Sequence, residues 1–195
     1  METIGESNVQ LPRMRDNLPA LRQLALLIRP GGQMVEVGSF AGESTRVFLD
    51  TGLHVHAIDP WDNESRDRLH EGAADFNPAH RWRFDMSDAE RRFDELLSLF
   101  PDQLKKSKGY DWQFADTFPS GSLDAVYLDA VHTYDDTVSA ISRWQPKIKP
   151  GGILCGHDFA SYYPGVVQAI RESLGEPHRA FADSSWMVTI GNATI

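Results

Sequence analysis

Apolar positions along this chain fall into two kinds of stretch, which alternate from one end to the other. The first kind is a short continuous apolar run bounded by glycine, proline or aspartate, the pattern of a buried strand. These runs predict strands at residues 33–37, 53–58, 111–115, 123–128 and 153–155. The second kind has apolar residues three and four positions apart, the spacing of one helix face. It predicts helices at residues 18–28, 44–50, 87–100, from 137 to about 148, and 166–174.

Strands that alternate with helices predict an α/β fold with a mainly parallel sheet, whose ligand sites lie at the carboxyl ends of the strands. Two further strands, at residues 179–182 and 186–190, are joined by a turn so short that it makes them antiparallel. The length of 195 residues fits a single domain. Within it we expect an N-terminal segment at residues 1–17 and a lid-like insertion at residues 63–108.

The most informative stretch covers residues 34–45 and reads Met-Val-Glu-Val-Gly-Ser-Phe-Ala-Gly-Glu-Ser-Thr. It predicts a strand, a glycine turn and the start of a helix. Gly38 and Gly42 allow the backbone to approach a ligand, and the N–H groups at the helix start suit a carboxylate or another anion. Glu36 lies at the strand tip, where an acid can meet a cationic group. A strand, turn and helix with a purely structural role is the alternative.

Acidic residues follow several predicted strands, at the edge where ligands bind. Asp59 comes about 20 residues after the glycine turn, where an acid accepts hydrogen bonds from ribose hydroxyls; a turn cap before Pro60 is the alternative. Trp61 would lie against an adenine face or cover the sheet edge. Asp116 follows the predicted strand at residues 111–115 and would approach an adenine amino group. The other polar residues at such tips are Asp129, His157 and Asp158.

Composition and charge exclude several classes of protein. The formal net charge of −9 argues against a general binder of nucleic acid or membrane surfaces, since both need basic patches. No apolar stretch is long enough to span a membrane, and residues 1–10 lack the apolar core of a signal peptide. The single cysteine, Cys155, lies in an apolar strand, which indicates an inert thiol and fits a reducing compartment. We therefore expect a soluble cytoplasmic protein.

Four motifs, in this order along the chain, resemble class I S-adenosylmethionine (SAM) methyltransferases. They read Val-Glu-Val-Gly-Ser-Phe-Ala-Gly-Glu-Ser-Thr, Ala-Ile-Asp-Pro-Trp, Tyr-Leu-Asp-Ala-Val-His-Thr-Tyr-Asp-Asp and Lys-Pro-Gly-Gly-Ile-Leu-Cys-Gly-His-Asp-Phe. Within that fold the chain is similar to the branch of macrocin and mycinamicin sugar O-methyltransferases. The resemblance covers residues 18–190 and implies a Rossmann-like sheet of seven strands, mostly parallel with the last antiparallel, and helices on both faces.

The resemblance also implies a SAM site. Glu36, Gly38 and Ser39 would hold the methionine moiety, Asp59 would hold the ribose, and Asp116 would lie near the adenine. The remaining residues of the implied cofactor site are Phe40, Gly42, Ser44, Pro60, Trp61 and Asp129.

A metal and a base are implied by the same resemblance. Metal-dependent relatives bind magnesium through an acid after the fourth strand and two residues after the fifth, here Asp129, His157 and Asp158. Some relatives use a histidine three residues after the first acid as the base, a position that His132 occupies. The chain departs from the pattern at His157, because magnesium prefers oxygen ligands. A structural hydrogen bond is the alternative for His132, and a tautomer-fixing contact is the alternative for His157.

The function that these expectations support is SAM-dependent methylation of a hydroxyl on a small sugar or natural product, with or without a divalent metal. In it His132 removes the proton while Asp129 and Asp158 position the hydroxyl. The alternatives are metal-independent N- or O-methylation and SAM binding without catalysis; the missing G-x-G-x-x-G motif disfavours a nicotinamide oxidoreductase. The acceptor pocket would be built from residues 1–17, 63–86 and 159–165. Residues 63–86 could equally be a solvated helix and loop. A homodimer is the commonest assembly.

Overall fold

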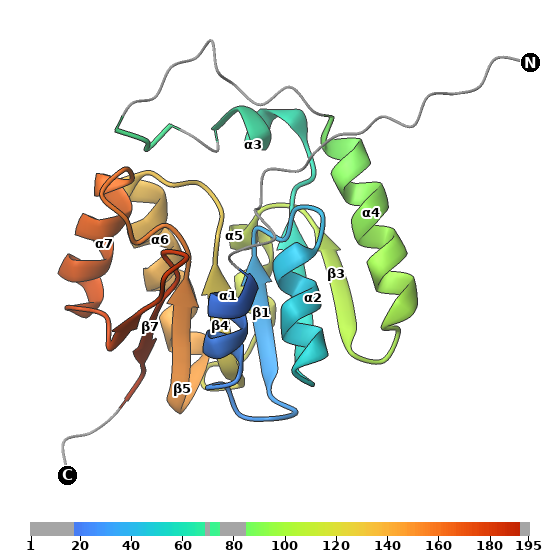
Figure 1. Ribbon diagram of the computed structural model, residues 1–195, viewed down its shortest axis with the longest axis horizontal. Coiled ribbons are helices and arrows are strands. Elements are labelled where there is room, and N and C mark those ends of the chain that lie inside the picture. Colours follow the sequence, from blue (N-terminus) through green and yellow to red (C-terminus); the bar gives the residue numbers. More distant parts are fainter. Residues whose placement is uncertain (1–17, 69–70, 75–84, 192–195) are drawn as a thin grey trace, which may run out of the picture.

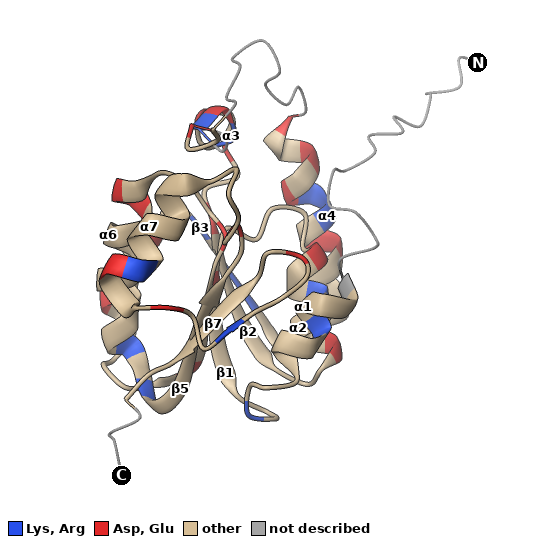
Figure 2. Cartoon of the chain, turned by 60° about the vertical axis from the view of Figure 1, so that its left-hand side comes forward, with Lys and Arg blue, Asp and Glu red and all other residues tan. Residues whose placement is uncertain are grey.

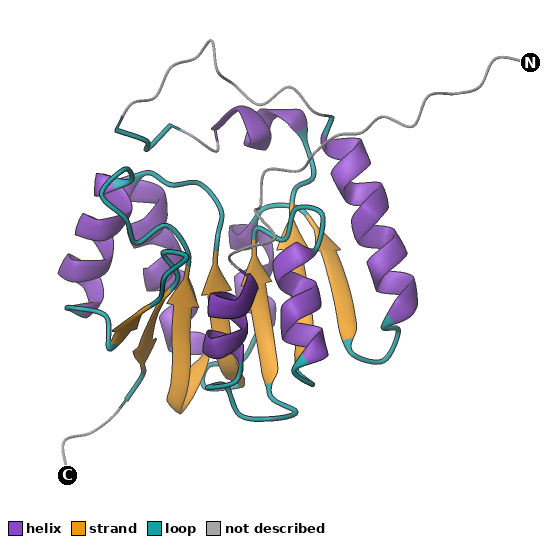
Figure 3. Ribbon diagram, in the orientation of Figure 1, coloured by secondary structure: helices purple, strands orange, loops and turns teal. Residues whose placement is uncertain are grey.

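The computed structural model describes residues 18–68, 71–74 and 85–191 of the chain. Its centre is a seven-stranded sheet with helices on both faces (Figures 1 and 3), which confirms the predicted α/β architecture. The strands are β1 (Gln33–Val37), β2 (His54–Asp59), β3 (Leu104–Lys108), β4 (Leu123–Leu128), β5 (Ile148–Gly156), β6 (Arg179–Ala180) and β7 (Trp186–Thr189).

The strands lie in the order β3-β2-β1-β4-β5-β7-β6. Neighbours from β3 to β5 are parallel, whereas β7 is antiparallel to both β5 and β6, as expected for the last strand. The register brings the ends of the central strands level, because Val37 pairs with Leu128 and Leu128 pairs with Gly156. Residues that follow β1, β4 and β5 therefore meet at one edge of the sheet.

Each face of the sheet has its own apolar core, since successive side chains of a strand point to opposite faces. Met34 and Tyr127 pack with α1, α2 and α4 on one face, whereas Val35 and Val126 pack with α5, α6 and α7 on the other. A further helix, α3, lies over the carboxyl ends of the strands (Figure 1). The helices are α1 (Leu18–Ala25), α2 (Glu43–Asp50), α3 (Asn63–Arg68), α4 (Met86–Leu99), α5 (Asp111–Phe114), α6 (Tyr134–Trp144) and α7 (Pro164–Leu174).

The predicted strand at residues 111–115 is wrong. Those residues form α5 and the start of a 3-10 turn, and the third strand is Leu104–Lys108, which pairs with β2. Its sequence, Leu-Lys-Lys-Ser-Lys, has one apolar residue because β3 is an edge strand, where lysines hinder pairing with another sheet. A sheet strand thus lies inside the range 63–108, which we expect to be a lid-like insertion.

The remaining differences concern boundaries. β5 begins at Ile148 rather than at 153, and α6 ends at Trp144, since Pro146 follows in a 3-10 turn. Charged side chains lie mainly on the helices and at the ends of the strands, apart from the lysines of β3 (Figure 2). No helix in the described part of the chain has both the length and the apolar character needed to cross a membrane. Phe76 and Trp82, in the middle of the lid-like insertion, lie outside the described residues.

Candidate active site

The glycine turn after β1 requires glycine at position 38. Gly38 has φ 86°, and a Cβ there would lie 1.9 Å from the carbonyl oxygen of Asp129. The backbone of the turn therefore lies directly against the residue that follows β4. The Gly38 N–H donates to the Ile58 carbonyl at 2.9 Å, and the Asp129 N–H donates to the Val37 carbonyl at 2.8 Å. These bonds fix the tips of β1, β2 and β4 to one another.

Asp59 braces the same turn from the tip of β2. One of its oxygens, Oδ2, accepts the N–H groups of Ser39 and Phe40, both at 3.0 Å, and Oδ1 accepts the N–H of Trp61 at 2.7 Å. Burial raises the pKa of Asp59, although the three N–H donors counteract it. The turn amides of Ser39 and Phe40 are thus satisfied from within the protein. Phe40 and Trp61 both have positive φ, at 47° and 45°.

Glu36 lies beneath the turn and is fully buried. Its carboxylate accepts hydrogen bonds from the hydroxyls of Ser44 and Thr45, both in the first turn of α2. The two hydroxyls tie β1 to α2 and so fix the entry into the helix. Thr45 is a site residue that the sequence analysis did not single out, although it ends the motif that contains Glu36.

Trp61 covers the sheet edge, the second of the two roles considered for it. Its indole N–H donates to the Phe40 carbonyl at 2.7 Å, and its ring centroid lies 4.9 Å from that of Phe93 in α4. Lys106 lies over the ring, with Nζ 4.6 Å from the centroid. The indole is therefore buried on the α4 side of the turn, and Pro60 precedes it in the partly exposed loop.

Asp116 is not brought to this edge. Its carboxylate is fully exposed and lies 3.6 Å from Nζ of Lys147, just before β5 begins at the opposite end of the sheet. Its expected place at a strand tip depended on the strand at residues 111–115, which does not exist. The residue that follows β3 at the site is Tyr110, whose hydroxyl donates to Asp62 at 3.3 Å. The ring of Tyr110 stacks on that of Trp112, with centroids 6.1 Å apart.

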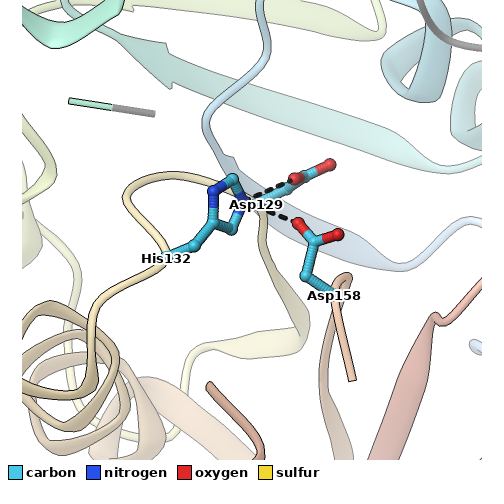
Figure 4. Close-up of side chains that lie close together, drawn as sticks. All are labelled: Asp129, His132 and Asp158. Carbon is cyan, nitrogen blue, oxygen red and sulfur yellow. Dashed lines mark ion pairs between the residues drawn. The ribbon is translucent and has the colours of Figure 1, made fainter. Parts of the chain in front are cut away.

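Asp129, His132 and Asp158 come together where β4 and β5 end (Figure 4). Nε2 of His132 lies 2.6 Å from Oδ2 of Asp158 and 3.7 Å from Oδ1 of Asp129. The other ring nitrogen, Nδ1, points away from both carboxylates (Figure 4). All three side chains are largely buried, with between 7% and 12% of their surface exposed.

Asp158 is the most strongly held group of this cluster. His157 Nδ1 lies 3.0 Å from its Oδ1, and the Tyr162 hydroxyl donates to the same oxygen at 3.3 Å. Burial acts to raise the pKa of Asp158, but hydrogen bonds and charge from His132 and His157 outweigh it and hold the pKa well below its usual range. The backbone of Asp158 has φ 62°, a conformation that costs energy in a residue with a side chain.

These residues partly fit the metal site that the resemblance implies. Asp129, His132 and Asp158 each bring one ligand atom to within 4.8 Å of the others, in the described part of the chain. His157 is outside this group, and its ring contacts Asp158 instead, which agrees with the alternative considered for it. Two carboxylates and one imidazole are a suitable donor set for a divalent ion that accepts both oxygen and nitrogen.

The segment after α3 lies against the loops that carry these residues. A Cβ on Gly72 would lie 1.8 Å from the carbonyl oxygen of His132, and the Ala74 N–H donates to the Tyr162 carbonyl at 2.8 Å. Arg68 pairs with Asp136 at 2.9 Å, at the start of α6. Residues 71–74 are therefore in contact with the loops after both β4 and β5.

The sheet order, with β7 antiparallel, and the glycine turn after β1 define the fold of class I SAM methyltransferases. The family described as "Methyltransferase domain" matches residues 35–159, and the chain belongs to this family.

Two solved structures share the fold. The O-methyltransferase TomG from Streptomyces achromogenes, in complex with SAM, has a TM-score of 0.59 and 13% identity, over 91% of this chain and 81% of that one. The O-methyltransferase NovP has a TM-score of 0.59 and 17% identity, over 89% and 79%. At these identities the likeness concerns the fold alone.

A relative in sequence is the 8-demethyl-8-(2,3-dimethoxy-alpha-L-rhamnosyl)-tetracenomycin-C 4'-O-methyltransferase of Streptomyces olivaceus. The two sequences are 26% identical over an alignment of 174 positions, which covers 81% of this chain. The chain spans 64% of the length of that relative.

Proposed function

We propose that this protein transfers the methyl group of SAM to a hydroxyl oxygen of a small glycoside. The observation that carries the proposal is the contact of His132 with Asp158 at the sheet edge beside the glycine turn. Family membership supports methyl transfer, and the Streptomyces olivaceus relative, whose name describes methylation of a rhamnosyl group, supports a sugar hydroxyl as the acceptor. The lone buried Cys155 is consistent with work in the reducing cytoplasm.

The cofactor would lie along the turn from β1 to β3. Its methionine end would lie beside Gly38 and Ser39, with Glu36 acting from below to shape the turn rather than touching the ligand. The ribose would meet Asp59, because Oδ1 accepts one N–H and a carboxylate oxygen can accept a second hydrogen bond. The adenine would lie near Tyr110, two residues after the end of β3, instead of near Asp116.

His132 is suited to remove the proton of the acceptor hydroxyl. Nε2 of His132 lies 2.6 Å from the Asp158 carboxylate, which can only accept, so we assign the ring proton to Nε2 and the lone pair to Nδ1, the nitrogen that points away from the carboxylates (Figure 4). Nδ1 takes the proton while the hydroxyl oxygen bonds to the methyl carbon and the carbon–sulfur bond breaks, which releases S-adenosylhomocysteine (SAH). The Asp158 carboxylate stabilises the imidazolium that results. The protein's main contribution is to place the oxygen in line with the methyl group.

A divalent ion would be held by the carboxylates of Asp129 and Asp158. Nε2 of His132 would be a third ligand only without its proton, in place of the contact with Asp158 on which the base role depends. Bound there, the ion would lower the pKa of a coordinated acceptor hydroxyl.

The test is SAH formation from SAM with a panel of aromatic O-rhamnosides, with and without EDTA. Turnover of rhamnosides but not of the matching aglycones supports the proposal. Loss of turnover in EDTA would show that a divalent ion is needed for methyl transfer. SAH or SAM binding without turnover of any hydroxylated acceptor would instead support a binding protein without catalysis.

A further inference from the structure

We propose that His157 is a positioning residue, whose ring holds the Asp158 carboxylate against His132. The proposal rests on the proposed function, in which His132 is the base. It assigns a role to the residue that stands where the resemblance implies an oxygen ligand for a metal. In this role His157 acts through Asp158 and touches neither cofactor nor acceptor.

The geometry of the Asp158 carboxylate is the first argument. Its two oxygens are divided between two imidazoles, with Oδ2 at 2.6 Å from His132 and Oδ1 at 3.0 Å from His157. Only 8% of the side chain is exposed, so water contributes little to holding it. A carboxylate that is free to rotate would not keep one oxygen directed at Nε2 of His132. The contact from His157 supplies the shorter of two restraints on the other oxygen, the second being the Tyr162 hydroxyl at 3.3 Å.

The anchoring of His157 is the second argument. Its backbone N–H donates to the Leu128 carbonyl at 3.1 Å, and its carbonyl accepts the indole N–H of Trp186 at 3.2 Å. On the far side of the ring, Nε2 lies 3.5 Å from the Ser184 hydroxyl. The Ser184 carbonyl in turn accepts the Phe159 N–H at 3.0 Å. His157 is thus fixed to β4, β7 and the hairpin between β6 and β7, which makes it a rigid support.

These contacts also define the tautomer that the role requires. Since the carboxylate of Asp158 can only accept, Nδ1 of His157 carries the proton of this contact. A nitrogen that donates to Asp158 has no lone pair for an ion. The group of ligand atoms within 4.8 Å of one another accordingly contains His132 and not His157.

The experiment compares His157→Asn, His157→Gln and His157→Leu with the parent protein. An Asn side chain places an amide N–H close to the position of the histidine Nδ1–H, a Gln side chain places it farther out, and Leu has none. The first readout is the proton NMR signal of the His132 ring N–H, identified by its loss in His132→Gln. This signal is read without acceptor or cofactor, so it reports the His132–Asp158 contact whether or not the protein transfers methyl groups.

We expect a far-downfield His132 signal in the parent and in His157→Asn, and its loss in His157→Leu. With an acceptor that the parent protein methylates, we expect kcat to fall about tenfold or more in His157→Leu. This is less than the full contribution of a general base, because His132 itself is still present. The KM for SAM is unchanged. His157→Asn restores most of kcat, whereas His157→Gln does not. The matched control is His178→Leu, which removes a histidine at the opposite end of β7, where its ring accepts the Thr189 N–H at 3.0 Å. It leaves the signal and kcat unchanged.

Two results would overturn the proposal. One is a His132 signal and kcat that survive in His157→Leu. The other is weaker Mn²⁺ binding in His157→Asn and His157→Leu alike, with the His132 signal retained, which would make His157 a ligand. If His157→Leu does not fold, the comparison of His157→Asn with His157→Gln takes its place. Equal His132 signals and equal kcat in these two variants would then contradict the proposal. An intact signal in a parent protein that turns over no acceptor would contradict only the proposed function.

Discussion

At the scale of single residues, the acids of this site divide into those that shape the backbone and those that face the ring of His132, the proposed base. The Asp59 carboxylate accepts hydrogen bonds from the turn amides, and the Glu36 carboxylate accepts them from two hydroxyls of α2. Asp129 and Asp158 instead face the ring of His132. The sequence places all four near one edge but cannot tell these uses apart, because the difference depends on φ angles and on which amide each oxygen meets.

Replacement of His132 by glutamine tests the base. We expect kcat to fall by about 10²- to 10⁴-fold, the usual contribution of a general base, because the amide cannot accept the hydroxyl proton. The Kd for SAH, measured by calorimetry, should stay within twofold of the parent value, since His132 belongs to the acceptor side of the site. A variant that keeps its turnover would remove His132 from the mechanism and leave it a structural role in the loop after β4.

At the scale of elements, the sequence predicted the strands that carry the motifs but not the edge strand β3. β1 and β4 begin and end where their apolar runs predict, since both are buried on two faces. β3 has no such signal, because it lies at an edge of the sheet and its lysines extend toward Glu90 and Asp94 of α4. That error also misplaced Asp116, whose role was inferred from a strand tip. Charge pairing between an edge strand and a helix leaves no apolar pattern to recognise.

The glycine turn allows a matched comparison of two substitutions. Gly38 and Gly52 have nearly the same φ, 86° and 85°, but a Cβ meets the Asp129 carbonyl only at Gly38 and nothing within 4 Å at Gly52. Gly52→Ala should therefore cost the backbone strain alone, about 1–2 kcal/mol of unfolding free energy. Gly38→Ala should cost more and abolish SAH binding, because the turn must separate from β4. Equal losses in denaturant unfolding, with SAH binding intact in both, would contradict this account of the turn.

Asp124 joins three segments at the opposite end of the sheet. Its carboxylate accepts the Gln33 N–H and the Lys149 ammonium, both at 2.9 Å. Burial acts to raise the pKa of Asp124, but the hydrogen bonds from Lys149 and Gln33 outweigh it and the pKa is lowered. We expect Asp124→Asn to reduce the unfolding free energy by about 1–3 kcal/mol at neutral pH, as for other hydrogen bonds to a charged group.

The pH dependence of this loss follows from the sign of the shift. A carboxyl whose pKa is lower in the folded state stabilises the protein above its unfolded pKa of about 3.9, and this contribution disappears as the pH falls through the folded value. The gap between the parent and Asp124→Asn should therefore be widest at neutral pH and close under acid conditions. Asp116→Asn, an exposed acid beside Lys147 at the same end, should show no gap at any pH. A gap for Asp124→Asn that is independent of pH would show that the loss has another cause.

At the scale of the whole molecule, the range 63–108 both completes the sheet and reaches over its carboxyl edge. Its last part is β3, whereas residues 71–74 contact the loops after β4 and β5. Sequence alone left a lid and a solvated loop equally open for residues 63–86, because polar side chains serve both. The close approach of Gly72 to the His132 carbonyl places residues 71–74 against the loop that carries the candidate base, while the role of the whole range stays a prediction.

Substitution of Gly72 by alanine tests that contact. The added Cβ would overlap the His132 carbonyl, so residues 71–74 or the loop after β4 must move. We expect kcat/KM for the acceptor to fall at least tenfold while thermal unfolding changes little, because the segment is partly exposed and only Ala73 packs against an apolar core. A loss of thermal stability with unchanged kcat/KM would make Gly72 a packing residue of the fold and not part of the site.

The central claim is that the edge formed by β1, β2 and β4 binds SAM. The most direct measurement is calorimetry of SAH and SAM with the parent protein and with Gly38→Ala. The account predicts one molecule of either ligand per chain, with a Kd on the order of micromolar, about −8 kcal/mol, and no binding to the variant. Absence of binding to the parent, with EDTA or with added Mg²⁺ or Mn²⁺, would contradict the account and leave the glycine turn as a structural feature of the fold.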